Sequence, residues 1–271
     1  MRTLLQVVPG NVISCTGRWA ARTIRGRGFD DGSVLYRLGE GVTKTERTLG
    51  GIPLFRTLTK ADLDRLETTC IWREYAAGQW VIDHEGDGTD IFVVLRGHLR
   101  VVTATGGRET ILRDLHDGEY FGELAALDSR PRSAGVLAVT TSTLACMPAA
   151  TLRGAIHDHS DVCDQILATL VGQIRMLANR ANETAGLSAR QRMWAEMLRL
   201  AGSKRATLGN AILSPPPTHA ELAARIGSHR EAVTRELNAM ERSGLIARRR
   251  GAIELLDTTR LRRMVDEAGA R

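Results

Sequence analysis

Short apolar runs separated by turn signals fill the stretch from Trp72 to Pro148, whereas the segments on either side show helical spacing. The runs are QWVI, IFVVLRGHLRVVT, ETILRDL and AGVLAVTTSTLACM, and the turn signals among them are EGDG, RGH, TGG and HDGE. Apolar runs of this length, bounded by glycine-rich turns, are typical of β-strands. A succession of many short strands predicts a β-barrel or jelly roll.

A helical pattern precedes the strands. In residues 52–70, Leu58, Leu63 and Leu66 recur at helical spacing. Thr59 stands at the start of this segment, and its hydroxyl can accept a hydrogen bond from a backbone N–H of the first turn. We therefore predict a helix that begins after Thr59.

A second helical pattern, in residues 160–182, has the spacing of a coiled coil. Apolar residues there lie 4, 3, 4, 3 and 4 positions apart, and they are Cys163, Leu167, Leu170, Ile174, Leu177 and Ala181. Such a seam predicts that another helix lies against it. The seam packs either against the same helix of a second copy or against the chain's own barrel. We favour the first, a homodimer.

The C-terminal part predicts a pair of capped helices. RQRMWAEMLRLA reads as a short helix, and SPPPT at 214–218 is a sharp break. Thr218 and Ser228 each precede a glutamate by three positions, which is the capping-box pattern that opens a helix. Gly227 and Gly244 are placed to end the two helices. Two helices joined at a glycine indicate a helix-turn-helix.

The segment after the second helix predicts a wing. LIARRRGAIELL reads as a β-ribbon that turns at Arg250 and Gly251. In a helix-turn-helix the start of the second helix reaches base edges in the major groove, and arginines of a wing suit phosphates. We expect the DNA-contacting residues to be Thr218, Ser228, His229, Arg230, Glu231, Thr234, Arg235, Arg248, Arg249 and Arg250.

Charge is distributed in a way that fits this division. The formal net charge is +6, made up of +4 in residues 1–48, −3 in residues 49–202 and +5 in residues 203–271. A basic terminal module favours a polyanionic partner, most commonly nucleic acid. Residues 1–48 are rich in glycine and arginine and show little periodicity, so we expect a flexible extension or translated upstream sequence.

Cysteine usage and hydropathy exclude several classes of protein. The four cysteines are far apart and show no CxxC spacing, which argues against a disulfide framework, a zinc knuckle or a clustered iron–sulfur site. No apolar run reaches the ~18 residues that a membrane span requires. The N-terminal apolar stretch is broken by Pro9, Gly10 and Asn11, so it is a poor signal peptide. We expect a cytoplasmic protein with no membrane partner.

Residues 121–134, FGELAALDSRPRSA, carry the candidate ligand chemistry. Glu123 and Arg132 lie among small and apolar residues on a turn bounded by glycine. The two side chains either pair with each other or each bind a part of a ligand. A buried guanidinium needs an anion, for which a phosphodiester is suited, and a buried carboxylate needs donors such as a ribose hydroxyl.

The order of β-roll, long helix and winged helix-turn-helix, together with two motifs, resembles the Crp/Fnr family of bacterial transcription regulators. FGELAALDSRPRSA resembles the phosphate-binding cassette of cyclic-nucleotide-binding domains, and GSHREAVTRELNAMERSGLI resembles the family's recognition helix. The resemblance covers about residues 50–260 and is strongest to the cyclic-AMP receptor branch. It implies an α+β fold with these parts: an extension at 1–48, a cyclic-nucleotide-binding β-roll (jelly roll) at 49–159, a dimerisation helix at 160–185 and a winged helix-turn-helix at 186–271.

The resemblance also implies a ligand site. In the family the cassette glutamate takes the ribose 2′-hydroxyl, the arginine pairs with the cyclic phosphate and the next hydroxyl residue adds a hydrogen bond. Carried over, the cyclic-nucleotide-binding set is Gly122, Glu123, Leu124, Arg132, Ser133, Leu112, Leu115 and Asn179. The resemblance to the cyclic-AMP receptor branch implies cAMP as the ligand. The family's base-contacting Thr-Ser pair is replaced by Leu177 and Ala178, so cGMP is the alternative.

The function implied is that of an allosteric, homodimeric regulator that binds palindromic TGTGA-type sites and works with RNA polymerase. One alternative keeps DNA binding but makes it independent of nucleotide or responsive to another ligand. An alternative of another class is a nucleotide-binding signalling adaptor whose winged helix contacts protein. A metal site at His157, His159, Asp161 and Cys163 lacks ligand spacing, so we expect none. Glu119 and Glu123 could form a catalytic carboxylate pair, but nothing nearby in the sequence supplies a nucleophile or a metal. We therefore expect that the protein is not an enzyme.

Overall fold

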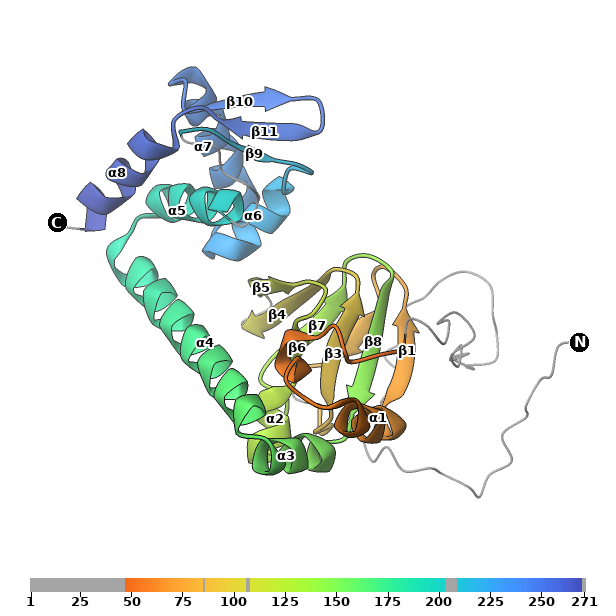
Figure 1. Ribbon diagram of the computed structural model, residues 1–271. Coiled ribbons are helices and arrows are strands. Elements are labelled where there is room, and N and C mark those ends of the chain that lie inside the picture. The colour runs from red at the N-terminus through yellow and green to blue at the C-terminus, as the bar shows by residue number, and fades with distance from the viewer. Residues whose placement is uncertain (1–46, 85, 106–107, 203–208, 270–271) are drawn as a thin grey trace, which may run out of the picture.

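The computed structural model describes residues 47–84, 86–105, 108–202 and 209–269. Apart from its last two residues, the extension expected at 1–48 lies outside these ranges. The described part of the chain folds as a β-roll, a long helix and a C-terminal helical domain with a small sheet (Figure 1). This is the α+β architecture that the resemblance implies.

The first helices lie at one end of the β-roll. A 3-10 turn, η2, spans Pro53–Phe55, and helix α1 spans Lys60–Thr69. The side chain of Thr59 accepts a hydrogen bond from the backbone N–H of Asp62, which confirms the predicted cap. Both elements pack their apolar side chains on the roll.

The β-roll consists of two antiparallel sheets of four strands each, in the orders β1-β8-β3-β6 and β2-β7-β4-β5. A core of alternate side chains, including Val94, Leu99, Leu115 and Leu144, belongs to strands of both sheets. The strands are β1 Ile71–Tyr75, β2 Trp80–Ile82, β3 Ile91–Arg96, β4 Leu99–Thr105, β5 Arg108–Leu115, β6 Tyr120–Phe121, β7 Gly135–Ala138 and β8 Ser142–Met147.

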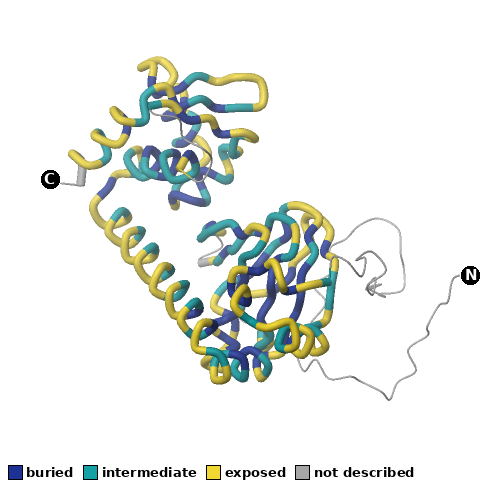
Figure 2. Tube along the Cα trace, in the orientation of Figure 1, coloured by how far each residue is buried: buried dark blue, intermediate teal, exposed yellow. Residues whose placement is uncertain are grey.

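Three helices follow or interrupt the roll. Helix α2, Glu123–Asp128, lies within the candidate cassette, and α3, Ala149–Asp158, follows β8. Helix α4, Ser160–Gly186, leaves the roll beside α3 and runs to the C-terminal domain (Figure 1). Val162 and Ile166 near its start are buried in the core of the roll, whereas most of its length is exposed (Figure 2).

The C-terminal domain is a winged helix-turn-helix. Helices α6 and α7 are joined at Gly227, whose φ of 61° is left-handed and suits glycine. The wing strands pair as predicted, and β9 adds a third strand beside β11. The elements are α5 Ala189–Gly202, β9 Ala211–Leu213, α6 His219–Ile226, α7 Arg230–Arg242, β10 Ile246–Arg249, β11 Ala252–Leu255 and α8 Thr258–Gly269.

One of the two predicted capping boxes forms. Thr218 caps α6 reciprocally with Glu221, as the pattern predicts. The second box, Ser228 with Glu231, is wrong, because α7 begins one residue later with His229 at its N-cap and no side-chain capping hydrogen bond. The tight turn after Gly227 carries the chain directly into α7, and Ser228 donates its backbone N–H to the carbonyl of Ala223 instead.

Candidate effector site and nucleic-acid interface

Arg132 is buried at the base of the candidate cassette, with 6 % of its surface exposed. Its Nη1 donates to the carbonyl oxygen of Gly122 at 3.1 Å and its Nη2 to that of Asp90 at 2.7 Å. The guanidinium carbon lies 5.7 Å from the ring centre of Phe92, which is itself stacked on Phe121. Two carbonyls and an aromatic face therefore orient the guanidinium.

Gly122 is required by this arrangement. Its φ is 86°, a left-handed conformation that side chains rarely adopt. A Cβ at this position would lie 2.6 Å from Nη1 of Arg132 and 2.9 Å from the carbonyl oxygen of Asp90. The glycine that bounds the turn is thus what allows the backbone to approach the guanidinium.

The charge of Arg132 is only partly compensated within the described part of the chain. No described carboxylate lies within 4.0 Å of its nitrogens, and its hydrogen bonds go to neutral carbonyls. Burial lowers the pKa of the guanidinium, and the more distant charges of Asp90, Cys146 and Glu123 oppose that effect. A desolvated cation held by neutral acceptors has the chemistry to pair with an anion.

Glu123, the other charged residue of the cassette, pairs with α4 rather than with Arg132. It is 5 % exposed, and its Oε1 accepts a hydrogen bond of 2.9 Å from Nε2 of Gln173. Among the described ion pairs, none joins Glu123 to Arg132, so the internal salt bridge weighed from the sequence is not formed there. The carboxylate therefore keeps acceptor capacity beyond its one bond to an amide.

The other predicted ligand residues are divided among the cassette, β5 and α4. Leu124 and Ser133 are exposed near Glu123 and Arg132, Leu115 is fully buried in the core of the roll, and Leu112 is half-buried. Asn179 is exposed on α4. Sequence reasoning missed Asp90, Phe92 and Gln173. Asp90 acts through its backbone carbonyl, which carries no sequence signal, whereas Gln173 follows Ile166 and Leu170 at helical spacing.

Helix α4 has two distinct faces. The side with Ile166, Leu170 and Gln173 meets the roll, and Leu170 packs against its core although the sequence places it in the seam. The opposite side exposes a stripe of apolar side chains, in which Ile174 is 65 % exposed. The large members of this stripe are Leu167, Val171, Ile174 and Leu177, with Ala178 and Ala181 also exposed and Cys163 half-buried.

The predicted DNA-reading side chains occupy one region of the helix-turn-helix. His229, Arg230, Glu231 and Arg235 are exposed on the first turns of α7, and Val233, Leu237 and Met240 are buried behind them. Oγ1 of Thr234 lies 2.8 Å from Nδ1 of His219 and donates to the carbonyl of Arg230. Thr218 is exposed at the N-cap of α6, and Ser228 is half-buried in the turn.

The wing arginines are exposed, but two of them already have partners. Arg248 contacts Asn238 and lies 3.4 Å from Glu241, so it ties the wing to α7. Arg249 lies 3.5 Å from Glu254 across the ribbon, and Arg250 lies at the exposed turn. These positions suit contacts to phosphate rather than to bases.

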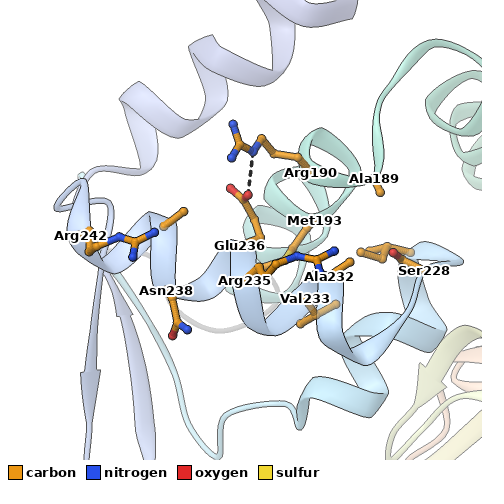
Figure 3. A pocket seen from close by; sticks show the side chains of 12 residues that line it. Ala189, Arg190, Met193, Ser228, Ala232, Val233, Arg235, Glu236, Asn238 and Arg242 are labelled. Carbon is orange, nitrogen blue, oxygen red and sulfur yellow. Dashed lines mark hydrogen bonds and ion pairs between the residues drawn. The ribbon is translucent and has the colours of Figure 1, made fainter.

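A hollow of about 470 Å³ lies beside α7 (Figure 3). Arg235 and Arg242 of α7 line it, and across it Arg190 of α5 pairs with Glu236 at 2.7 Å. Glu236 also accepts a hydrogen bond of 2.9 Å from the indole of Trp194. The two bonds fix α7 against α5, so the orientation of the exposed side chains of α7 depends on α5.

The described residues contain neither a membrane-spanning helix nor a metal-binding cluster. No helix there is long and apolar enough to cross a membrane. His, Cys, Asp and Glu side chains do not gather there in groups of three or more that could hold a metal ion, and this includes the segment from His157 to Cys163.

Comparisons with known proteins agree with this architecture. Residues 72–159 match the cyclic nucleotide-binding domain, and residues 191–264 match the Crp-like helix-turn-helix domain. The chain is 30 % identical over 213 residues to the cyclic AMP receptor protein of Thermus thermophilus, covering 78 % of this chain and 95 % of the relative.

Solved structures give the same result. A transcriptional regulator of the CRP/FNR family from Thermus thermophilus is 26 % identical, with a TM-score of 0.55 over 72 % of this chain and 98 % of that one. A CooA mutant from Carboxydothermus hydrogenoformans shares the fold, with a TM-score of 0.69 at 17 % identity over 81 % of this chain and 98 % of that one. The chain therefore belongs to the Crp/Fnr family of DNA-binding transcription regulators.

Proposed function

We propose that this regulator is a homodimer whose DNA binding responds to a cyclic nucleotide. The observation that carries the proposal is Arg132, a buried cation oriented by neutral carbonyls and a ring, nine residues from a buried acid that contacts α4. A cyclic phosphate would supply the anion that Arg132 lacks among the described residues, and a ribose 2′-hydroxyl would donate to Glu123.

Cyclic AMP is the ligand we expect, with cyclic GMP as the alternative. The Thermus relative is named for cyclic AMP, and the cassette residues fit the ribose-phosphate portion that both nucleotides share. Leu177 and Ala178 offer no side-chain hydrogen bond to a base, so base selectivity depends on other residues such as Asn179.

The exposed stripe of α4 favours pairing with a second copy. Contiguous apolar side chains on an exposed face mark an interaction surface, and Leu167, Val171 and Ile174 repeat at the spacing of a coiled coil. Because Gln173 lies on the same helix and contacts Glu123, ligand at the cassette can influence how two such helices pair. Dimerisation would also place two copies of α7 for half-sites about one DNA turn apart.

The half-site we propose is TGTGA, within the palindrome TGTGA-N6-TCACA. Arg230 and Arg235 can each donate two hydrogen bonds to a guanine, and Glu231 can accept from a cytosine amino group. All three side chains are exposed on the first turns of α7. His229 stands beside them at the N-cap, so contacts at the edge of the half-site involve an imidazole.

Titration calorimetry on the full chain tests the ligand. We expect binding of cyclic AMP or cyclic GMP, and Arg132→Leu should weaken it at least about tenfold, equivalent to ~1.4 kcal/mol. Binding of neither nucleotide, with intact binding to DNA, would favour the nucleotide-independent regulator. Nucleotide binding without any DNA footprint would instead favour the signalling adaptor.

A further inference from the structure

Charged side chains of α6 contact the β-roll directly. Arg225 contacts Asp114 of β5, and Glu221 contacts Arg100 of β4. Arg100 also donates to Asp114, with 2.8 Å between Nε and Oδ1. Four charges of alternating sign therefore join the first helix of the helix-turn-helix to the β4–β5 hairpin. We name Arg100, Asp114, Glu221 and Arg225 the junction cluster.

The junction cluster continues into the two helices that connect the domains. Glu196 of α5 lies 3.5 Å from Arg225 and 3.8 Å from Arg180 of α4. Arg180 in turn donates to the carbonyl of Ile111 in β5 at 3.0 Å. The contacts thus link β5 to α6, α6 to α5, α5 to α4, and α4 back to β5.

These charges are largely removed from water. The side chains of Glu196, Arg225 and Asp114 are 2 %, 5 % and 17 % exposed. Burial raises the pKa of Asp114, but contacts with His98 and Arg100 and the charge of Arg225 outweigh it, so the carboxyl stays ionised. Buried ions are tolerated only while they are paired. Opening the junction would therefore require these charges to be exposed to water together.

The junction lies on the side of α6 that begins at Thr218, one of the expected DNA contacts. Thr218, Glu221 and Arg225 lie three and four positions apart, so they follow one side of α6. That side is held against β4 and β5 by the junction cluster. Thr218 at its N-terminal end is among the expected DNA contacts, so the hairpin stands beside a part of α6 that DNA would approach.

The same hairpin reaches the candidate cassette. Arg113, next to Asp114 on β5, lies 3.3 Å from the carbonyl oxygen of Tyr120 in β6. Tyr120 is three residues before Glu123. In a strand, neighbouring side chains point to opposite faces, so Arg113 and Asp114 connect β5 to the cassette and to α6 respectively.

We propose that the junction cluster is an interdomain latch, in which ion pairs of Arg100 and Asp114 with α6 hold the helix-turn-helix in an orientation unfavourable for DNA, and that ligand at the cassette releases it. This rests on the proposed function. The latch is a differential contact: it exists in one orientation only, so removing it shifts the population toward the other.

Two substitutions open the latch without removing side-chain volume. Asp114→Asn removes the charge that faces Arg225 and Arg100, and Glu221→Gln removes the charge that faces Arg100 while keeping an oxygen for the α6 cap. Asp64→Asn is the matched control, because Asp64 is an exposed acid on α1 paired only with Lys60 in the described chain. It makes the same change in net charge.

Binding of the full chain to a TGTGA-N6-TCACA duplex without nucleotide is measured by fluorescence anisotropy. Both latch variants should bind about tenfold more tightly than the unmodified chain, an effect typical of allosteric coupling, while Asp64→Asn is unchanged. The ratio of affinities with and without cyclic AMP should shrink in the same variants. Thermal unfolding verifies that each variant is folded, and Glu221→Gln keeps the test available if Asp114→Asn is unstable.

Small-angle X-ray scattering provides a readout that does not depend on DNA or nucleotide. The latch variants should show a larger radius of gyration than the control at equal oligomeric state. If the unmodified chain binds no DNA under any condition, the proposed function fails and scattering alone decides the latch. Folded latch variants with unchanged scattering, or with DNA affinity equal to that of the control, would overturn the proposal.

Discussion

Nε2 of Gln173 lies 2.9 Å from Oε1 of Glu123, which joins the long helix α4 to the candidate cassette by a hydrogen bond. The two residues are fifty positions apart in the chain. Glu123 begins the short helix α2, and Gln173 lies on the side of α4 that meets the roll. Whatever binds Glu123 therefore acts on the helix whose other side is the exposed apolar stripe.

The first prediction concerns this bond. Gln173→Ala should leave Glu123 with fewer donors and a less fixed orientation, and we expect cyclic nucleotide affinity to fall roughly threefold to tenfold. If the bond serves the ribose contact, the same substitution should hardly change the affinity for a 2′-deoxy analogue. Calorimetry with both ligands measures the difference, and equal losses for the two would contradict this role.

Gly122→Ala should disturb the orientation of Arg132. The added Cβ would meet the guanidinium at 2.6 Å in a backbone conformation with φ of 86°. We expect nucleotide affinity to fall at least about tenfold. The free energy of unfolding should fall by ~1 kcal/mol or more. Gly154→Ala is the control, because nothing lies within 4 Å of a Cβ built there. A Gly122→Ala protein that binds nucleotide normally would show that the close approach is not needed.

Ile174→Arg should yield monomers, because it places a charge in the middle of the exposed stripe. Ile174 is 65 % exposed, so the folded protomer should tolerate the change. Leu170→Arg is the contrasting variant: Leu170 packs on the roll, and a buried charge there should lower the thermal stability of the protomer. Sedimentation showing an intact dimer of Ile174→Arg would mean that another surface mediates assembly.

Recognition and wing arginines should differ in their effect on DNA. Arg230→Ala should weaken the free energy of DNA binding by ~1–3 kcal/mol and relax specificity at one guanine. Arg249→Ala should weaken all sequences alike and reduce the salt dependence by about one phosphate contact. Selection from random duplexes, together with affinities over a range of salt, distinguishes the two. An enriched motif without G·C pairs opposite Arg230 and Arg235 would refute the proposed reading.

Asp114 should contribute to stability in a pH-dependent way. Its pKa in the folded chain lies below the usual value near 4, so the native state stays deprotonated where the unfolded chain takes up a proton. Its contribution is therefore complete above about pH 4 and is lost as the pH falls through the folded pKa. Below pH 4, Asp114→Asn should lessen the loss of unfolding free energy by up to about 1.4 kcal/mol per pH unit. Equal slopes for both proteins would contradict this.

Much of the fold follows from local patterns in the sequence. Short apolar runs between turn signals predicted most of the strands of the roll, because runs of this length are typical of strands. The helix caps at Thr59 and Thr218 use contacts within four residues, and they form as predicted. The wing likewise depends on a turn at Arg250 and Gly251 between two neighbouring strands.

Contacts between distant segments were decided by the tertiary structure. The coiled-coil spacing includes Leu170, but Leu170 packs against the roll, whereas Val171 is exposed. The helical period alone does not determine which side of a helix meets which neighbour. Ser228 fits a capping box, yet the turn at Gly227 makes His229 the N-cap. Other contacts join residues up to 121 positions apart. They are the carbonyls around Arg132, the hydrogen bond from Gln173 to Glu123, and the ion pairs between α6 and the β4–β5 hairpin. Charge pairing at such a separation depends on how the domains dock, and no periodicity within one element records it.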